Sequence, residues 1–591
     1  MKILGISLGH DSNMALIEDG KIKAIWEAER YFRQKRYKLS AKQLETGKYP
    51  DGFQYSDVDE LLFMLRRVKT QWGDAFDLVA VQNQGRLDEQ ANLEVLLKQV
   101  GIGFEKIENV NHHLSHASLI FYTSPYSESL VLSFDGDGND GQTVLFNATK
   151  EKIDYLENYT QRFGQSYNNL GFLIGISPDI SGTGSGKTMG LAAYGNLREE
   201  WLPLARKYVQ EYRKLKGKNV EGLNSYGKSH TINSVGLDEI SELQKYLFSS
   251  DEKKGWLEKI KGSLLGRAET NSTGEKKEMV LQGVDHSDSH DLAKTVQRAW
   301  TEGVIEILEK HTSVSQNLCV VGGCALNGIT NYEIQQKGIF KNTYFVPNPT
   351  DCGLAAGAAL NLYYKYSGKT YKGSSEYYSP YLGEEIYDRE DLPKLREKYE
   401  YLDVSPSETA SRVAKYIAEG KIVGVIRGRY EVGPRALGNR SILSNPIDPN
   451  MREILNHKVK HREWYRPFAP VVTAEDTHRY FTNAEEIPYM SVICYTKEEY
   501  QKMLPSITHV DGSCRLQTIR RNQNEFLYDT IKAFEKITGH PVVLNTSFNP
   551  GGEPILNFAH VGLEMLDKTQ MDIVLIDDTF YCKKGNEKVL E

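Results

Sequence analysis

The sequence predicts an α/β protein with two domains, and three observations support this. In the first part of the chain, a strand that ends in a glycine turn occurs three times, at residues 2–9, 130–138 and 317–323. The last part alternates helix, strand and polar loop, as in SETASRVAKYIAEGKIVGVIRGRYEVGPRALG. A length of 591 residues favours two or more cores over one. The predicted domains are residues 1–368, with an insertion at about 200–290, and residues 369–591.

The composition excludes several classes of protein. Apolar residues make up 40% and charged residues 26% of the chain, which is typical of globular proteins with sizeable cores. The net charge of −7 gives no general attraction for nucleic acid, so any anion site must be local. The start, MKILGISLGHDSN, becomes polar too early for a signal peptide, and no apolar run is long enough to span a membrane. Six cysteines without a CxxC pair predict reduced thiols in a cytoplasmic protein, with neither a zinc site nor a disulfide framework.

The N-terminal residues predict a strand, a glycine turn and a β-hairpin. KILGISLG reads as a strand that ends in glycine, and Asp19-Gly20 joins two further strands. The glycine turn carries His10 and Asp11. On these residues alone, a polar turn with a capping aspartate is the better interpretation.

The stretch ENVNHHLSHASLIFYTSP holds the clearest metal signal. His112 and His116 are four residues apart, so on a helix both imidazoles project from one face, whereas His113 points elsewhere. Such a pair alone is more often structural than a ligand pair. The following strand, however, delivers Asp135 into a glycine turn, with Asp137 close by. Histidines and carboxylates with open positions suit iron(II) or another divalent first-row ion.

The middle of the chain contains a false P-loop and a genuine glycine turn. GTGSGKTMGLAAYG lacks the Walker glycine, because position 181 is serine, and the polar segment SPDISG precedes it instead of a strand. Residues 200–290 are rich in Lys, Glu, Ser and Gly, and we expect an insertion with surface helices and a loop. NLCVVGGCALNGITNYEIQQ then predicts a buried strand, a Gly322-Gly323 turn and a helix that could approach a nucleotide.

Residues 429–470 of the second domain concentrate cations on rigid loops. Glycines and prolines stand among them, so short braced loops hold the guanidinium groups in fixed directions, which suits phosphate oxygens. A basic surface patch is the alternative interpretation. The cations are Arg429, Arg435, Arg440, Lys458, Lys460, Arg462 and Arg466.

Four motifs in this domain resemble those of the NodU/CmcH/TobZ-type O-carbamoyltransferases. They are GPRALGNRSIL, VKHREWYRPFAP, DGSCRLQT and NTSFNPGGEPI. The resemblance extends over most of the chain, through GKTMGLAAYG at 186–195 and, loosely, through Glu29-Arg30, to which we assign no chemistry. It implies an N-terminal actin-like ATPase domain of the ASKHA type and a C-terminal YrdC-like domain. The run Tyr430-Glu431-Val432 departs from relatives that have an acidic residue followed by Phe, with little expected effect because Glu431 keeps the charge.

The resemblance also implies roles for particular residues. His10 becomes the candidate general base, with Asp11 as the next candidate, because a neutral imidazole can take a hydroxyl proton near pH 7. The implied metal ligands are His112, His116, Asp135 and Asp351. The implied nucleotide contacts of the first domain are Lys187, Gly322, Gly323 and Asn327. The implied carbamoyl phosphate and ATP contacts of the second domain are Arg435, Arg440, Lys460, Arg466, Arg515, Asn545, Ser547 and Asn549.

The implied reaction has two steps. In the second domain, carbamoyl phosphate loses phosphate and the resulting carbamate reacts with ATP, accompanied by magnesium, to give carbamoyl-adenylate and pyrophosphate. In the first domain the carbamoyl group passes to a hydroxyl of a small-molecule or nucleotide acceptor. The alternatives are a tRNA or protein acceptor, or an actin-like ATP-binding protein without transfer activity. The family commonly forms homodimers, but the sequence leaves the oligomeric state, the acceptor, the metal and the role of the insertion open.

Overall fold

The computed structural model describes residues 1–41, 58–82, 87–136, 142–159, 161–176, 184–211, 220–223, 229–232, 285, 287–482 and 484–591. The chain divides into two compact units. One unit consists of Met1–Asp140, Val144–Glu157 and His311–Glu591, and the other of Gly141–Thr143 and Asn158–Lys310. Both units are built from helices and sheets, so the predicted α/β class is confirmed.

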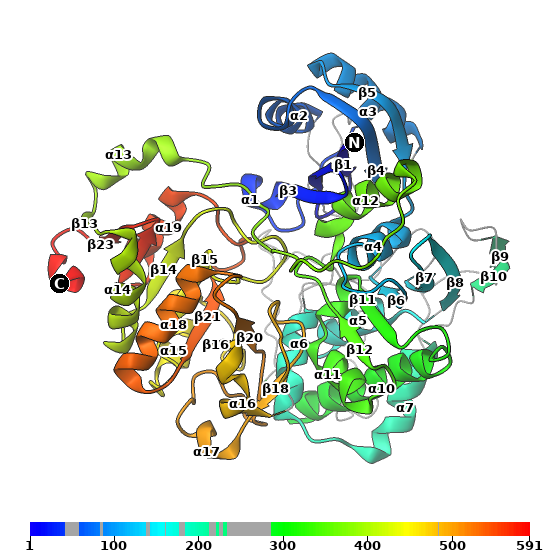
Figure 1. The fold of residues 1–591 in the computed structure, drawn as a ribbon. Coiled ribbons are helices and arrows are strands. Elements are labelled where there is room, and N and C mark those ends of the chain that lie inside the picture. The colour runs from blue at the N-terminus through cyan, green and yellow to red at the C-terminus, as the bar shows by residue number, and fades with distance from the viewer. Residues whose placement is uncertain are drawn as a thin grey trace, which may run out of the picture. The chain divides into compact units, whose positions relative to one another are not determined.

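The first sheet is formed by the N-terminal strands, drawn in blue in Figure 1. Its order is β3-β2-β1-β4-β5, and the predicted hairpin at Asp19-Gly20 is the antiparallel pair β2/β3. The strand β4 pairs in parallel with both β1 and β5. The strands are β1 (Lys2–Ser7), β2 (Asn13–Glu18), β3 (Lys21–Glu27), β4 (Ala75–Gln82) and β5 (Gly103–Asn109).

A second five-stranded sheet repeats this order. Its strand order is β12-β11-β6-β7-β8. If its strands are numbered 1 to 5 along the chain and the order is read from β8, it is also 3-2-1-4-5. The strands are β6 (Ser129–Phe134), β7 (Thr143–Ala148), β8 (Ile153–Tyr159), β11 (Asn317–Val321) and β12 (Asn342–Tyr344). The three predicted glycine turns therefore follow β1, β6 and β11, which are the inner parallel strands of the duplicated sheets.

Two helices lie between these sheets and hold the loops that matter below. The helix α12 (Leu354–Ser367) is rich in Ala and Gly, and it packs against β1, β2 and β4 and against α4 (His112–Phe121). A Cβ on Gly5 would lie 2.1 Å from the carbonyl oxygen of Ala355, and one on Gly357 would lie 1.9 Å from that of Ser115. The absence of side chains at these two positions lets α12 contact a strand on one side and α4 on the other.

We expect Gly357→Ala to destabilise the fold by about 1–3 kcal/mol, because the added methyl group would push α12 away from α4. Thermal and urea unfolding would measure the loss. Gly186→Ala is the control, since Gly186 also lies within a helix, α6 (Ser185–Leu191), and a Cβ there meets no other atom within 4 Å. Equal midpoints for Gly357→Ala and the parent protein would contradict this account of the packing.

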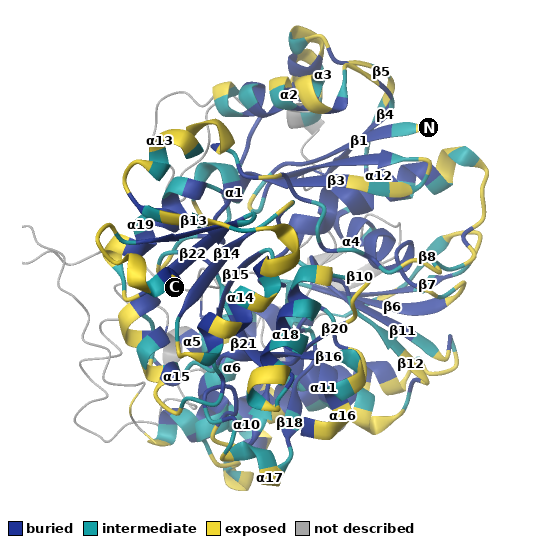
Figure 2. Ribbon diagram, turned by 60° about the vertical axis from the view of Figure 1, so that its left-hand side comes forward, coloured by how far each residue is buried: buried dark blue, intermediate teal, exposed yellow. Residues whose placement is uncertain are grey.

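The C-terminal domain is organised around an eight-stranded mixed sheet of order β13-β23-β22-β14-β15-β21-β16-β20. Its central strands are buried, as the dark blue ribbons of Figure 2 show. A three-stranded sheet, β17-β18-β19, accompanies it. The strands of the large sheet are β13 (Glu400–Asp403), β14 (Val423–Ile426), β15 (Arg440–Ser444), β16 (Ala469–Thr473), β20 (Gln517–Ile519), β21 (Val542–Ser547), β22 (Ile573–Ile576) and β23 (Thr579–Cys582), and those of the small one are β17 (Phe481–Thr482), β18 (Cys494–Thr496) and β19 (Ser513–Cys514).

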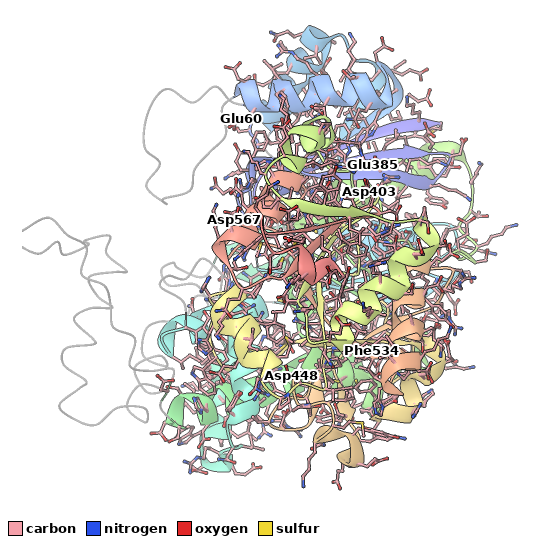
Figure 3. All side chains as sticks on the ribbon, turned by 90° about the vertical axis from the view of Figure 1, so that its left-hand side faces the viewer. Glu60, Glu385, Asp403, Asp448, Phe534 and Asp567 are labelled. Carbon is pink, nitrogen blue, oxygen red and sulfur yellow. The ribbon has the colours of Figure 1, made fainter. Side chains whose placement is uncertain are left out.

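Side chains alternate between the two faces of this sheet, and each face packs in a separate hydrophobic core. Val423 and Val425 of β14 pack on one face, beneath α14 (Pro406–Ala418) and α18 (Glu525–Thr538), which lie side by side in Figure 1. Ile426 faces the opposite core, which includes α19 (Ala559–Lys568). Phe534, labelled on α18 in Figure 3, is fully buried in the first of these cores. The predicted succession of helix, strand and loop is thus confirmed, with the period of two that a sheet buried on both faces requires.

Two segments differ from or refine the sequence interpretation. DIVLIDDTFYCKK, which reads as one strand in the sequence, forms the hairpin β22/β23, because Asp577 turns the chain with a positive φ of 52°. Between α12 and the short helical turn Arg389–Asp391 the chain has neither helix nor strand, as expected of a connection, but the compact units do not divide there. The boundary at residue 369 therefore stays a prediction.

The other unit is mainly helical. Its long helix α10 (Ser287–Glu309) includes most of DLAKTVQRAWTEGVIEILEKH, whose apolar spacing predicts an amphipathic helix, and it packs against α6 and α7 (Leu202–Glu211). Among the described residues, the element before α6 is the helix α5 (Phe163–Leu173), and Ser181, on which the interpretation of this segment as a false P-loop rests, lies outside them. The same holds for Asp137 and for most of the predicted insertion, of which α7 and the strand pair β9 (Val220–Leu223) and β10 (Ser229–Ile232) are described. None of the described helices is long and apolar enough to cross a membrane.

The described part of the chain contains eight further α-helices. They are α1 (Ala28–Phe32), α2 (Val58–Trp72), α3 (Leu87–Val100), α11 (Gly328–Lys337), α13 (Leu392–Arg396), α15 (Met451–Ile454), α16 (Thr477–Tyr480) and α17 (Glu498–Gln501).

Candidate functional sites

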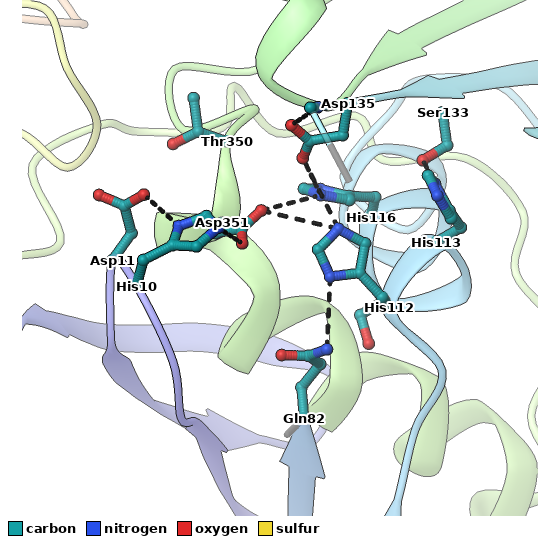
Figure 4. Close-up of polar contacts among 12 residues, drawn as sticks. His10, Asp11, Gln82, His112, His113, His116, Ser133, Asp135, Thr350 and Asp351 are labelled. Atoms are coloured by element: carbon teal, nitrogen blue, oxygen red, sulfur yellow. Dashed lines mark hydrogen bonds and ion pairs between the residues drawn. The ribbon is translucent and has the colours of Figure 1, made fainter. Parts of the chain in front are cut away.

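Four side chains predicted as metal ligands come together in the first domain (Figure 4). His112 and His116 project from the first turns of α4, Asp135 follows the end of β6, and Asp351 opens the turn before α12. His116 Nε2 lies 3.0 Å from Asp135 Oδ2 and 3.4 Å from Asp351 Oδ1. His112 Nε2 lies 3.6 and 3.7 Å from the same two oxygens. One ligand atom from each residue falls within 4.8 Å of all the others.

Neighbouring polar groups fix the orientation of these ligands. The side-chain amide of Gln82, at the end of β4, lies 3.3 Å from Nδ1 of His112. The Asn13 amide donates to the main-chain oxygen of Asp351 at 2.7 Å and accepts from the Ala355 N–H at 3.0 Å, which pins the turn before α12. His113 points away, as predicted, with its Nδ1 2.8 Å from the hydroxyl oxygen of Ser133. Such outer partners are typical of metal ligands.

The electrostatics of the cluster fit a divalent cation. Burial opposes a charge on His116, yet Asp135 and Asp351 raise its pKa to about 9. Burial likewise opposes the charge on Asp135, but the two histidines hold its pKa well below the usual range. His112 Nε2 is buried without a hydrogen-bond partner although it faces both carboxylates. Two imidazoles and two carboxylates that converge in this way form a donor set suited to iron(II) or another first-row divalent ion.

His10 borders this cluster, as Figure 4 shows. Its Nδ1 lies 2.9 Å from Asp11 Oδ2, and its Nε2 lies 3.4 Å from Asp351 Oδ2. Asp351, helped by Asp11 and opposed by burial, raises the pKa of His10 to about 9. The side chain is 47% exposed, so it is open to a reactant from solvent. Asp11 holds one ring nitrogen, and the other is directed at the candidate metal centre.

The Gly322-Gly323 turn also borders the cluster. Gly322 has a φ of 95°, and a Cβ there would lie 2.2 Å from the carbonyl oxygen of Phe134. A Cβ on Gly323 would lie 2.8 Å from Asp135 Oδ1. Both glycines are therefore required by close approach to the end of β6. Asn327 caps α11 by accepting from the Thr330 N–H at 3.1 Å. Lys187 lies on α6 in the other compact unit.

The second domain contains a cluster of arginines, here called the arginine cluster, formed by Arg435, Arg462, Arg466 and Arg515. Burial and the neighbouring Arg466 lower the pKa of Arg435 to about 10. Burial and the other three members hold the pKa of Arg515 well below its usual range. The Nε atoms of Arg435 and Arg515 are buried and have no hydrogen-bond partner. Cations that repel one another and leave buried donors unused favour a bound polyanion.

Lys460, Ser547 and Asn549 form a network beside this cluster. Lys460 Nζ donates to the main-chain oxygens of Ser547 and Asn549 at 2.7 and 3.0 Å, and to Asn549 Oδ1 at 2.6 Å. The Ser547 hydroxyl donates to the same Oδ1 at 2.7 Å. Burial and two members of the arginine cluster hold the pKa of Lys460 well below its usual range. The structure therefore brings these residues together, with Lys460 bound to the loop after β21.

Asn545 connects that strand to the loop that carries Arg435. Its amide donates to the main-chain oxygen of Ala436 at 3.1 Å and to Gln517 Oε1 at 2.8 Å. The Oδ1 atom of Asn545 is buried without a partner. This side chain therefore offers one unused acceptor next to the arginine cluster.

Arg440 differs from the other predicted contacts of this domain, because its donors are already bound to protein groups. It is fully buried, and protein acceptors occupy all five of its donors. Nε and Nη2 donate to Asn557 Oδ1 at 3.0 and 2.8 Å, and the remaining N–H groups donate to main-chain oxygens of Arg427, Asn439 and Gly428. The residue belongs to β15 and points into the domain, where it holds the neighbouring loop.

Sequence reasoning missed two residues of these sites. Gln82 could have been found because it is a polar residue at the carboxyl end of a buried parallel strand. Arg462 belongs to the predicted basic stretch but was given no site role. Its Nε donates to Asn456 at 2.7 Å and its guanidinium lies 4.1 Å from the centre of the Phe468 ring, which fixes it within the arginine cluster.

Metal content provides a direct test of the first site. We expect one divalent ion per chain after anaerobic purification with iron(II). His116→Ala should lower the metal affinity at least about 100-fold, because loss of an outer partner of a metal ligand already lowers it by up to about 100-fold. Elemental analysis and iron(II) titration would measure both. His113→Ala is the matched control on the same helix and should keep the metal. An equal metal content in His116→Ala and the parent protein would show that the cluster is structural.

Comparisons with known proteins cover nearly the whole chain. The family model described as Carbamoyltransferase N-terminus matches residues 2–360, and the one described as Carbamoyltransferase C-terminus matches residues 414–583. Nodulation protein NolNO of Sinorhizobium fredii is 30% identical over 97% of this chain and 79% of its own length. Nodulation protein NolO of Bradyrhizobium diazoefficiens is 30% identical, over 79% of this chain and 78% of its own length. Nodulation protein U of Sinorhizobium fredii is 27% identical, over 93% of this chain and 94% of its own length.

Solved structures give a weaker likeness. Full-length HypF in the phosphate- and nucleotide-bound form aligns over 61% of this chain and 55% of its own, with 11% identity and a TM-score of 0.31. At that score the likeness carries no argument about this chain.

Proposed function

The chain belongs to the NodU/CmcH family of carbamoyltransferases, and we propose that it is an O-carbamoyltransferase with two reaction sites. The arginine cluster of the second domain makes carbamoyl-adenylate from carbamoyl phosphate and ATP, with release of phosphate from the former and pyrophosphate from the latter. The site around His10 in the first domain passes the carbamoyl group to a hydroxyl of a small-molecule or nucleotide acceptor, with release of AMP. The observation that carries the proposal is the arginine cluster with unused buried donors, in a chain that also holds a separate histidine and aspartate centre.

The chemistry of the first step requires cationic groups that are already positioned before negative charge develops in the transition state. Phosphoryl transfer spreads negative charge over several oxygens, and fixed donors aimed at that charge are the main means of catalysis. Arg435 and Arg515 have buried N–H groups without protein acceptors, so they can serve this role without first breaking a hydrogen bond. Arg466 lies among them and is partly exposed. Lys460 and Asn549 hold the loop that presents Ser547.

In the second step, His10 accepts the proton of the acceptor hydroxyl. Its Nδ1 is oriented by Asp11, which leaves Nε2 directed at the reaction centre. His112, His116, Asp135 and Asp351 would hold the metal, and such an ion supplies Lewis-acid polarisation of a carbonyl or phosphoryl oxygen. Positive charge next to Asp351 would also weaken the attraction that keeps His10 protonated, so that the imidazole is available as a base.

We assign the finer fold classes as part of the same proposal. The duplicated strand order of the two N-terminal sheets supports an actin-like domain, with glycine turns after β1, β6 and β11. The large mixed sheet with its arginine cluster supports a YrdC-like domain. The six cysteines, all free thiols in the structure, support a reducing compartment such as the cytoplasm. A homodimer is proposed from the family alone.

A small-molecule or nucleotide acceptor is favoured over a tRNA by the net charge of −7, which offers nucleic acid no general attraction. A non-catalytic ATP-binding protein is disfavoured because it would have no use for the second cluster. The test measures pyrophosphate release from ATP with and without carbamoyl phosphate, and then screens hydroxyl acceptors with labelled carbamoyl phosphate. Pyrophosphate release that does not depend on carbamoyl phosphate would rule out the proposed first step.

A further inference from the structure

A buried ion pair in the first domain has no role in either site described above. Glu27 ends β3 and Arg30 lies in the following helix α1, with Arg30 Nε 2.9 Å from Glu27 Oε2. The side chains are 3% and 0% exposed, so both charges are withdrawn from water. A buried pair of this kind is weak evidence for stability, because apolar residues of the same volume often stabilise a core equally well. The remaining hydrogen bonds of the pair are therefore more informative than the pair itself.

Those hydrogen bonds reach residues more than 400 positions away in the sequence. Glu27 Oε1 accepts from the Gly433 N–H at 2.7 Å, and Arg30 Nη2 donates to the Gly433 oxygen at 2.7 Å. The pair thus binds both main-chain groups of one glycine. Arg30 Nη2 also donates to the Glu431 oxygen at 3.2 Å, and Nη1 donates to the Ile555 oxygen at 3.1 Å.

The bound glycine stands in a crowded turn that only glycine can form. Gly433 has a φ of 97°, and a Cβ there would lie 2.2 Å from the carbonyl oxygen of Pro347. The turn is therefore pressed against the first-domain loop that leads to Asp351. Two residues later the chain reaches Arg435, whose Nε is buried and unpartnered in the arginine cluster. The direction in which Arg435 enters its site depends on how this turn is held.

The second loop held by the pair belongs to the same site. Ile555 follows the segment that carries Ser547 and Asn549, the residues bound by Lys460. One guanidinium, with its planar fork of donors, thus fixes the spacing between two loops that meet at the arginine cluster. An ammonium or an apolar side chain could not bind three carbonyl oxygens and one carboxylate in this geometry.

We infer that Glu27 and Arg30 are positioning residues of the anion site, placed in the first domain but acting on the second through Gly433. The inference rests on the proposed function in taking Arg435 as a contact of the phosphate substrates. It gives a physical role to Arg30 of the Glu29-Arg30 segment, and it makes the phosphate site of the second domain dependent on an ion pair of the first. A displacement of about 1 Å in a positioning element can cost a factor of about 100 in rate.

The test uses the full-length chain with Arg30→Lys and Glu27→Gln. Arg30→Lys keeps the charge but loses the fork, and Glu27→Gln keeps an acceptor for the Gly433 N–H. We expect the KM for carbamoyl phosphate to rise at least about tenfold in Arg30→Lys, with a smaller rise in Glu27→Gln. Arg67→Lys is the matched control, because Arg67 is also a first-domain arginine paired with a carboxylate, Glu384, but its hydrogen bonds, ion pairs and ring contacts among the described residues do not involve the 431–433 turn. It should leave that KM unchanged.

A double-mutant cycle distinguishes positioning from general destabilisation. If Arg30 acts through Arg435, then combining Arg30→Lys with Arg435→Lys should cost less than the product of the two single effects. Multiplicative effects, or a KM that follows the melting temperature across all variants, would overturn the inference.

Calorimetric binding of inorganic pyrophosphate separates this inference from the proposed reaction. If the wild type binds pyrophosphate and Arg30→Lys binds it at least about tenfold more weakly, the positioning role is supported even if no carbamoyl-phosphate-dependent turnover is found. If the wild type is active but its affinity for pyrophosphate equals that of Arg30→Lys, the positioning role is overturned and the proposed function stands. A wild type that neither turns over nor binds would remove both.

Discussion

Arg435→Ala should lower carbamoyl-phosphate-dependent pyrophosphate release by a factor of about 100–1000, because one fixed donor to developing charge contributes about 2.7–4 kcal/mol. The guanidinium has a buried Nε without a protein acceptor, so its removal leaves no protein group unpaired. It also relieves repulsion, since Arg466 lowers the pKa of Arg435. We therefore expect the melting temperature to be unchanged or slightly raised while activity is lost, and steady-state kinetics with thermal unfolding would measure the two effects.

Two control variants in the same basic stretch make this result interpretable. Lys458 is exposed, and Lys458→Ala should change neither activity nor stability beyond a small amount. Arg440→Ala should do the opposite of Arg435→Ala. It removes the donors that Arg440 gives to three main-chain carbonyls and to Asn557, so the melting temperature should fall first. Normal pyrophosphate release in Arg435→Ala would place the phosphate site elsewhere.

The contrast between Arg435 and Arg440 also marks what the sequence could reveal. Both arginines stand in the motif GPRALGNR, and their spacing does not distinguish the one that faces a site from the one that points into the domain. The difference is decided by Asn557, which lies 117 positions after Arg440 and occupies two of its donors. A motif contains only residues that are close in the sequence. The acceptor that binds the donors of an arginine can come from another strand or loop, as Asn557 does here.

Local signals were sufficient where function depends on local geometry. The spacing of His112 and His116 fixed one helix face, and the glycine turn after a strand placed Asp135 at a sheet edge. Asp351 came from family resemblance, because nothing near it in the sequence indicates that α12 brings it beside α4. The Glu27 and Arg30 pair lay beyond such reasoning, since its informative partners are 401 to 525 positions away.

His10→Asn should separate the two proposed reactions. Asparagine keeps much of the size and hydrogen bonding of histidine but cannot accept the proton, and loss of a general base typically costs a factor of about 100–10,000. The arginine cluster is untouched, so the variant should still release pyrophosphate from ATP and carbamoyl phosphate. We expect it to retain or slowly lose the adenylate and to deliver little carbamoylated product. Both products should be measured in the same reaction.

The position of His10 beside Asp351 demands one more measurement. His10 Nε2 lies 3.4 Å from a carboxylate of the candidate metal set, so the variant could act by changing metal content instead of proton transfer. His10 is not among the four converging ligands, and we therefore expect His10→Asn to keep its metal while His116→Ala loses it. Loss of both reactions in His10→Asn would assign the residue to nucleotide binding or folding. Retention of both would make it an ordinary turn histidine, and Asp11, 2.9 Å away, would be the next base to test by substitution with Asn.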